Sequence, residues 1–143
     1  MIVSKILEDK GREVVTIGPT ATIGEAVAEL AGHKIGALVV VEGRDRILGI
    51  ISERDVVRAV ARGVATYLAE PVTSIMTREV MTCGERETIN EVMTRMTRGR
   101  FRHLPVAKQG RLAGIISIGD VVKARIEEVE REAEEMRTYI ATA

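Results

Sequence analysis

The sequence predicts a mixed α/β (α+β) fold built from two similar repeats and a long C-terminal helix. The first observation is size: 143 residues, 45% hydrophobic and 29% charged, fit one compact domain or two very small ones. The second is an internal repeat, and the third is that both repeats show the same order of helix and strand patterns. A unit of about 60 residues buries too little surface to be stable alone, so we expect the two to pack as one module.

The internal repeat is offset by 66 positions in its first part and by 65 positions in its second part. The single-residue difference falls in the loop between two predicted strands. The matching segments are 14–18 with 80–84, 22–27 with 88–93, and 47–57 with 112–122.

The first unit begins with a short apolar segment and continues with a helix that Thr22 caps. Ile23, Ala26, Val27 and Leu30 recur at helical spacing and predict the buried face of this helix. The rest of the unit follows from continuous β-branched runs and a glycine-bearing turn. We expect strands over 38–41 and 47–51, a turn at 42–45, and a helix after the second strand.

The second unit repeats this order, with a helix over 88–96, strands over 102–106 and 112–116, and a turn at 108–110. The predicted organisation is therefore repeat 1 over 1–68, repeat 2 over 69–126, and an extension of the last helix over 127–143.

The last helix carries apolar residues at alternating spacings of four and three, which is an a/d stripe over nearly three heptads. Two interpretations stay open: the helix packs on its own domain, or it forms a dimer seam. Three heptads are marginal for an independent coiled coil. The stripe consists of Val122, Ile126, Val129, Ala133, Met136 and Ile140.

Composition excludes several classes of protein. One cysteine, Cys83, cannot form an internal disulfide, and two histidines are too few for a Cys/His zinc site, so we expect no metal. The longest apolar run, 35–41, is too short to span a bilayer, and no secretory signal is visible, so we expect a cytoplasmic protein without membrane contact. No nucleophile with a matched base, paired carboxylates or phosphate loop is visible, which argues against an enzyme.

Both units contain Gly-apolar-apolar-Ser-x-x-Asp where the second strand meets the following helix, at 49–55 and 114–120. One interpretation is a capping box, in which serine and aspartate only stabilise the helix start. The other is a ligand site, because a helix N-terminus with a serine hydroxyl suits a phosphate and a carboxylate one turn later can accept both hydroxyls of a ribose. These residues alone do not separate the two interpretations.

The two units resemble tandem CBS domains (cystathionine β-synthase type repeats, paired into a Bateman module) of the stand-alone bacterial or archaeal type. The resemblance covers residues 1 to about 126 and rests on repeat order, threonine-bounded helices, strands 38–40 and 104–106, and Gly-Ile-Ile-Ser-x-x-Asp in both units. It implies two β-α-β-β-α units that pair through their sheets with pseudo-two-fold symmetry and leave two clefts. In similar proteins these clefts bind AMP, ADP, ATP, NAD(H) or S-adenosylmethionine and regulate another activity.

The resemblance assigns roles to individual residues of both units. It places Asp55 and Asp120 at the ribose hydroxyls and Ser52 and Ser117 on the phosphate side. The remaining implied ligand contacts are the segments beside adenine, Thr16-Ile17 and Thr82-Cys83, and the cleft-lining strand residues Ala37, Leu38, His103 and Leu104. Cys83 takes the place of Ile17, so we expect it to be a small buried residue.

The two clefts are predicted to differ. In similar proteins, basic side chains on the middle strand of one repeat reach the phosphate held in the other repeat's cleft. The resemblance therefore implies that the Asp55 cleft gathers Arg54, Arg102 and His103, enough positive charge for a phosphate, whereas the Asp120 cleft has no such clamp unless Lys34 bends in. We expect tighter nucleotide binding at Asp55 and a weaker, roomier or empty site at Asp120. AMP is the first choice of ligand, with NAD(H) and ATP behind it.

Two other functions stay open beside the nucleotide sensor. The stretch 92–119 holds six basic residues and no acid, so its part from Arg95 to Arg111 could bind DNA or RNA. Against this, the chain has 21 basic and 21 acidic residues and only 2% aromatics. The other alternative is a structural dimer with empty clefts. The resemblance also implies a homodimer, and a regulated protein that would have to be another chain.

Overall fold

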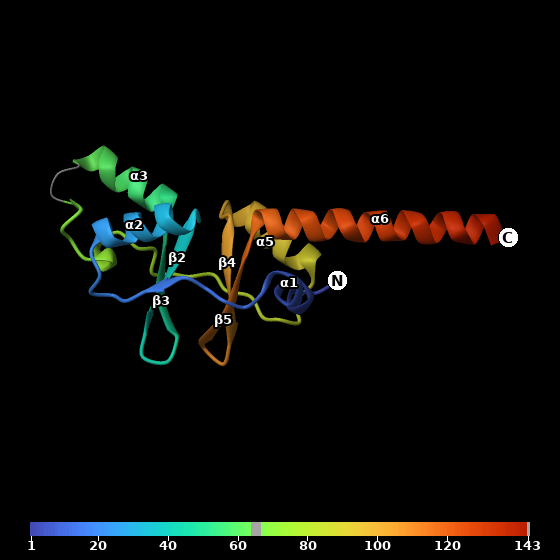
Figure 1. Cartoon of the computed structure of the whole chain (residues 1–143), viewed down its shortest axis with the longest axis horizontal. Coiled ribbons are helices and arrows are strands. Elements are labelled where there is room, and N and C mark those ends of the chain that lie inside the picture. The colour runs from blue at the N-terminus through green and yellow to red at the C-terminus, as the bar shows by residue number, and fades with distance from the viewer. Residues whose placement is uncertain (64–66, 143) are drawn as a thin grey trace.

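The computed structural model describes residues 1–63 and 67–142 (Figure 1). Its centre is one five-stranded sheet with the order β1-β2-β3-β5-β4. The first three strands come from the first repeat and the last two from the second, so the two units pair through their sheets as expected. The strand register between β3 and β5 consists of one residue pair, Arg46 with Arg111.

The first repeat follows the predicted order. It contains β1 (Thr16–Ile17), α2 (Ile23–His33), β2 (Ala37–Glu42), β3 (Arg46–Ser52) and α3 (Glu53–Arg62). The Thr22 hydroxyl accepts a hydrogen bond from the Glu25 amide at 3.1 Å, which begins α2 where the sequence predicts it. The short β1 lies parallel to β2, and β2 and β3 form an antiparallel hairpin.

The second repeat contains η1 (Val72–Ser74), α5 (Ile89–Gly99), β4 (His103–Lys108), β5 (Arg111–Ser117) and α6 (Ile118–Thr142). Thr88 caps α5 as Thr22 caps α2. The predicted strand start at Arg102 is wrong by one residue, because β4 begins at His103, which pairs with Ser117 of β5.

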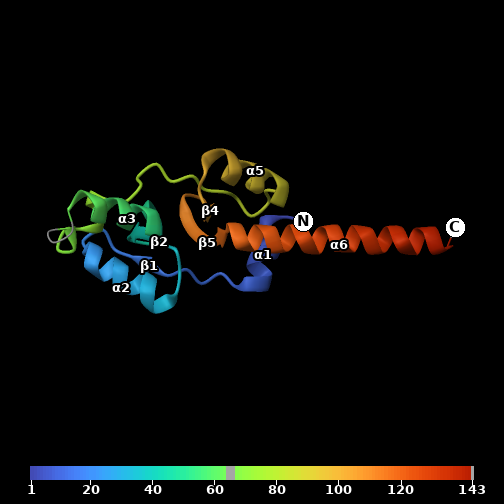
Figure 2. The same ribbon diagram turned by 90° about the horizontal axis from the view of Figure 1, so that it is seen from above.

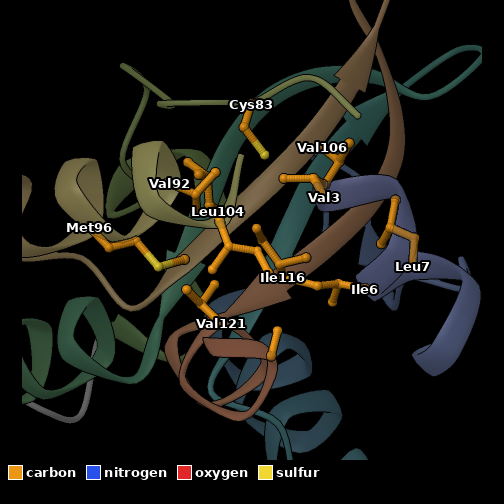
Figure 3. Close-up of a cluster of buried hydrophobic side chains, with 12 residues drawn as sticks. Val3, Ile6, Leu7, Cys83, Val92, Met96, Leu104, Val106, Ile116 and Val121 are labelled. Atoms are coloured by element: carbon orange, nitrogen blue, oxygen red, sulfur yellow. The ribbon is translucent and has the colours of Figure 1, made fainter. Parts of the chain in front are cut away.

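The two repeats exchange their leading segments. The N-terminal helix α1 (Val3–Lys10), which sequence patterns did not predict, packs into the core of the second repeat through Val3, Ile6 and Leu7 (Figure 3). Conversely, Val72 and Met76, at the start of the second repeat, pack into the core of the first. Each core is therefore completed by a segment from the other half of the chain.

Helix α6 leaves the body of the molecule and extends far beyond it as a single straight rod in both views (Figures 1 and 2). Only Val121 and Ala124 of this helix are buried, whereas five of the six stripe residues remain exposed hydrophobic side chains, the sixth being the small Ala133. The interpretation that the stripe packs on its own domain is therefore wrong. Within residues 1–63 and 67–142, no helix has the length and apolar content needed to cross a membrane.

Candidate functional site

A cavity of about 350 Å³ opens beside the N-terminus of α3, where the two repeats meet. This volume lies within the range of small-molecule pockets. Five of the residues singled out from the sequence line it together: Ser52, Arg54, Asp55, Arg102 and His103. The first three belong to the first repeat and the last two to the second, so the site needs both halves of the chain.

Ser52 and Asp55 form the capping box that one interpretation of the motif predicted. The Asp55 carboxylate accepts the Ser52 amide at 2.8 Å through Oδ2, and the Ser52 hydroxyl accepts the Asp55 amide at 3.3 Å. The second carboxylate oxygen, Oδ1, lies 3.4 Å from the hydroxyl of Thr77, a long hydrogen bond. One oxygen thus caps the helix while the other has unused acceptor capacity beside the cavity, so capping and ligand binding are compatible at this residue.

The cavity lining is rich in basic residues. Arg54, Arg58, Arg100 and Arg102 line the cavity together with the acidic Glu53 and Glu79. The Arg54 guanidinium donates to the Arg100 carbonyl at 3.1 Å and so joins α3 to the second repeat. Four guanidinium groups beside a helix N-terminus favour an anionic ligand.

His103 enters the cavity because residue 36 is glycine. A Cβ added at Gly36 would lie 3.0 Å from His103 Cε1, which is tighter than almost all real contacts. Burial lowers the pKa of His103 below its ordinary value of 6.5; Lys10 and Arg102 act in the same direction and Glu53 and Asp120 oppose them. The imidazole is therefore neutral at pH 7, and the approach of a phosphate would raise its pKa.

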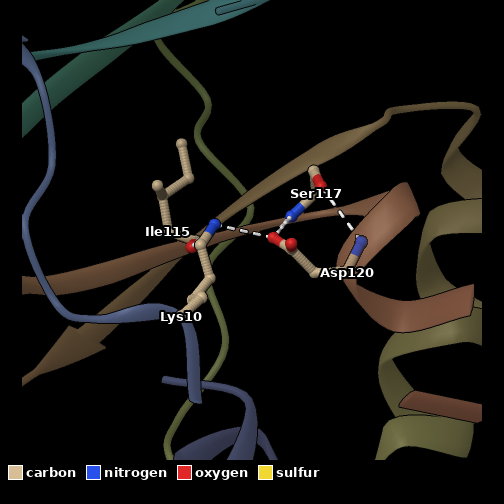
Figure 4. Close-up of polar contacts among 4 residues, drawn as sticks. All are labelled: Lys10, Ile115, Ser117 and Asp120. Carbon is tan, nitrogen blue, oxygen red and sulfur yellow. Dashed lines mark hydrogen bonds and ion pairs between the residues drawn. The ribbon is translucent and has the colours of Figure 1, made fainter. Parts of the chain in front are cut away.

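The second cleft is organised differently around the same motif (Figure 4). Asp120 accepts the Ser117 amide at 2.9 Å, as in the first repeat, but the same oxygen also accepts the Lys10 ammonium at 2.7 Å. Lys10 donates in addition to the Ile115 carbonyl at 3.0 Å. Burial alone would raise the pKa of Asp120, yet the hydrogen bonds and charge of Lys10 and the Ser117 amide outweigh it and hold the pKa below 3.8.

Lys10 also lines the small cavity beside Asp120. The cavity that includes Asp120 and Lys10 has a volume of about 90 Å³, so the expectation of a roomier site is wrong. The sequence-based interpretation considered Lys34 as the cation that could approach Asp120. The structure places Lys10 there instead, because α1 packs on the second repeat.

Several residues that the resemblance places in the clefts serve the cores. Leu38 and Leu104 have no exposed surface, and Cys83 and Ala37 are also buried. The side chains of Leu38, Leu104 and Cys83 pack inside one of the two apolar cores, and the cleft position that the resemblance implies for these residues stays a prediction.

The two segments expected beside adenine, 16–17 and 82–83, form backbone contacts with neighbouring strands. Thr16 and Ile17 pair with Val39 and Val40 in the sheet, and neither is among the residues lining the Asp55 cavity. The Cys83 amide donates to Pro105 and its carbonyl accepts from Ala107, while the Thr82 carbonyl accepts from Arg95. Backbone groups of Cys83 are thus not available to a ligand.

Cys83 has the structural role that its position predicts. Burial raises the pKa of its thiol to about 12, with a further rise from Glu87 that Arg95 partly offsets. Such a thiol stays protonated and unreactive at neutral pH.

The segment that lines the Asp55 cavity in place of the expected one follows η1. The residues of this segment that line the cavity are Thr77, Glu79, Val80 and Met81. The segment is held there because the Thr77 amide donates to the Ile50 carbonyl of β3 at 2.8 Å and the Ile50 amide donates to the Thr77 carbonyl at 3.0 Å. A sequence signal that could have identified them is the repeat offset of 66 positions. It relates Thr77 to Gly11, the residue that directly follows the N-terminal segment 3–10.

The basic stretch from Arg95 to Arg111 does not form one surface. Arg95 is paired with Glu87 at 2.5 Å, and Arg100 and Arg102 line the Asp55 cavity. Arg111 lies at the end of the β4–β5 hairpin, beside the β2–β3 turn. This dispersion gives a nucleic-acid backbone fewer adjacent contacts than the sequence suggested.

Comparisons with known proteins agree with this architecture. The family model described as the CBS domain matches residues 5–62 and 72–127. A CBS-domain containing protein of Agrobacterium tumefaciens is 53% identical, with a TM-score of 0.84 over 87% of this chain and 99% of that chain.

Two further solved structures contain ligands. A CBS domain protein of Pyrobaculum aerophilum, complexed with AMP, is 31% identical with a TM-score of 0.75 over 84% of this chain and 89% of its own. A CBS domain pair in complex with 5-methylthioadenosine and S-adenosyl-L-methionine is 26% identical with a TM-score of 0.79, over 90% of this chain and 98% of its own.

Proposed function

The chain belongs to the CBS-domain family, and on that premise we propose that it is a non-enzymatic regulatory module that binds an adenine nucleotide in the Asp55 cavity. One observation carries the proposal. Asp55 Oδ1 has only a 3.4 Å bond to Thr77, and it shares its cavity with Arg54, Arg102 and His103. A carboxylate acceptor suits a ribose diol, and the two guanidinium groups suit a phosphate of the same ligand, with the imidazole beside them.

AMP is the ligand we propose first, with NAD(H) and ATP next and ADP and S-adenosylmethionine also compatible. A similar protein was solved with AMP, and another with S-adenosyl-L-methionine and 5-methylthioadenosine. The cluster of four arginines favours a phosphorylated ligand over a sulfonium, because a hydrogen bond from a guanidinium is stronger when its acceptor carries negative charge.

Binding would act on the joint between the repeats. Arg54 and His103 come from different repeats and line the same cavity, so a ligand that contacts both favours one packing of the two halves. Because β3 and β5 are joined through one residue pair, few sheet hydrogen bonds resist a change in that packing. A second protein that recognises the nucleotide-bound packing would be the regulated partner.

The first experiment is a thermal-shift panel of AMP, ADP, ATP, NAD⁺, NADH and S-adenosylmethionine on the wild type and on Asp55→Asn. We expect one adenine nucleotide to raise the melting temperature in proportion to the logarithm of its concentration, and the variant to lose this response. Asn keeps the size of the side chain and can still accept the Ser52 amide, so it removes the charge with little effect on the cap. A flat panel for the wild type would contradict the proposal.

A further inference from the structure

The exposed stripe of α6 is the largest apolar feature that the nucleotide site does not use. Val122, Ile126, Val129, Met136 and Ile140 are 44 to 68% exposed although they are large hydrophobic residues. They lie along one face of a helix that projects from the body in both views (Figures 1 and 2). Such a continuous apolar face on an isolated chain marks an interaction surface.

The stripe is separate from the face that packs on the domain. Val121 and Ala124, the buried residues of α6, precede and follow Val122 by one and two positions and so lie on another side of the helix. A hollow bounded by Ile118, Gly119, Val122 and Ile126 continues the stripe to the start of the helix. The apolar face is therefore accessible from its first residue to its last.

The stripe has the spacing of a two-stranded coiled coil. With Ile126, Ala133 and Ile140 at a positions, the d positions are Val122, Val129 and Met136. Isoleucine at a is typical of two-stranded coiled coils, while the β-branched Val122 and Val129 stand at d, where leucine would strengthen that preference. The stripe spans about 27 Å at 1.5 Å per residue, which is short for an independent coiled coil but begins on a folded domain that already orders the helix.

The charges beside the stripe distinguish the two possible directions of a partner helix. In a parallel pair each g residue faces the partner's e residue five positions later. Arg125 then faces the partner's Glu130, and Glu132 faces the partner's Arg137, so both contacts join opposite charges.

An antiparallel pair places like charges together. The register that matches every apolar residue sets Val122 against the partner's Ile140 and Ile126 against the partner's Met136. Glu130 then faces the partner's Glu130, and Glu132 faces the partner's Glu132. Lys123 would in addition face the partner's Arg137.

We propose that α6 forms a parallel, in-register two-stranded coiled coil with a second copy of this chain, which sets two nucleotide modules side by side at the same end. The occupant is a second copy because the charges that flank the stripe complement this same sequence in register. Val57 and Val60, exposed apolar residues of α3, lie outside this surface and serve as the comparison for the test.

The apolar contact is tested by sedimentation equilibrium of the full chain. We expect a dimer at micromolar concentrations, and Ile126→Glu should raise its dissociation constant about 100-fold because each dimer then buries two carboxylates. Val57→Glu is the matched control and should leave the dimer unchanged. A monomeric wild type, or a dimer lost in Val57→Glu and kept in Ile126→Glu, would overturn the proposal.

The parallel direction is tested by reversing charges. Glu132→Arg should weaken the dimer about 10-fold, and adding Arg137→Glu should restore it, because two such pairs exist per dimer. Glu135→Arg changes the net charge equally at an outward position and should have no effect. If Arg137→Glu alone strengthens association, the helices are antiparallel and the proposal fails.

Cysteine crosslinking provides a second measure of direction. Met136→Cys should form a disulfide dimer under mild oxidation, whereas Thr138→Cys, on the outward side, should not. The native Cys83 is buried with a pKa raised to about 12, so it does not compete. Absence of the Met136→Cys crosslink in a dimeric sample would contradict a parallel register. If the stripe instead binds a different protein, the purified chain would be monomeric, which would also contradict the proposal.

Discussion

The two clefts share one motif but differ in the residue that meets its carboxylate. Asp55 and Asp120 both accept the amide of the serine three residues earlier, at 2.8 and 2.9 Å. Beyond that serine, Asp55 accepts a hydrogen bond from the Thr77 hydroxyl at 3.4 Å, whereas Asp120 accepts one from the Lys10 ammonium at 2.7 Å. The motif therefore determines where a helix begins, and the segment that crosses over from the other half of the chain determines whether the carboxylate is available.

The crossing segments are held by equivalent glycines. A Cβ at Gly49 would meet the Met76 sulfur at 2.6 Å, and one at Gly114 would meet a Leu7 methyl at 2.8 Å. Both strands thus lack a side chain where the exchanged segment packs. The two exchanged segments therefore pack against equivalent glycines, but they differ in sequence. This difference places the Thr77 hydroxyl beside Asp55 and the Lys10 ammonium beside Asp120.

The largest expected effect comes from removing each carboxylate. Asp55→Ala should weaken nucleotide binding about 100-fold, since hydrogen bonds from two ribose hydroxyls to a carboxylate are lost. Asp120→Ala should change affinity by less than about twofold, because Lys10 already occupies that carboxylate. Titration calorimetry of both variants with the nucleotide identified by the panel measures the two affinities.

The two variants are matched controls for each other, because each removes a carboxylate that accepts the amide of the serine three residues earlier. A general loss of folding would therefore appear in both. Equal losses of affinity would show that both clefts bind the nucleotide equally, which would contradict the difference described between Asp55 and Asp120.

Much of the fold follows from the sequence because the repeat and the local patterns agree. Thr22 and Thr88 cap the helices that they were expected to cap, and the hairpin strands lie within a residue or two of their predicted bounds. These features depend on neighbours in the chain, which a sequence displays directly.

The exchange of segments could not be predicted in the same way. Nothing local in Val3–Lys10 or Val72–Ser74 indicates which of the two cores it completes, because both cores are aliphatic. Consequently Lys10 and Thr77, which decide the character of the clefts, were not among the candidate residues. Leu38 and Leu104 were selected instead, since strand position alone does not show which face of a strand is buried.

A smaller effect is expected from filling the two glycine positions. Gly49→Ala should destabilise the protein by about 2 kcal/mol, because its Cβ would also lie 2.9 Å from the backbone carbonyl of Thr77. Gly114→Ala meets only the flexible end of Leu7 and should cost less than about 1 kcal/mol. Urea denaturation measures both values.

Nucleotide affinity should respond to the same pair of substitutions. Gly49→Ala displaces Thr77, which lines the Asp55 cavity, so affinity should fall, while Gly114→Ala should leave it unchanged. If Gly114→Ala reduced affinity as much, the second cleft would contribute to binding.

The smallest expected effect is that of the lysine in the second cleft. Lys10→Met should reduce stability at pH 7 by about 1 kcal/mol, since the pair is only partly exposed, with 33% and 25% of the side-chain surfaces accessible. Lys5→Met is the matched control, because the Lys5–Asp9 pair is more than half exposed and should contribute almost nothing.

The pH dependence identifies Asp120 as the partner responsible. Since the pKa of Asp120 in the folded protein lies below its ordinary 3.8, its stabilisation is complete above pH 3.8 and is lost as the pH falls through the lowered folded value. The stability difference between wild type and Lys10→Met should therefore be constant near neutrality and shrink as the pH falls below 3.8. A difference that persists unchanged into that range would mean that Lys10 acts through its bond to the Ile115 carbonyl and not through Asp120, and the two clefts would then differ for another reason.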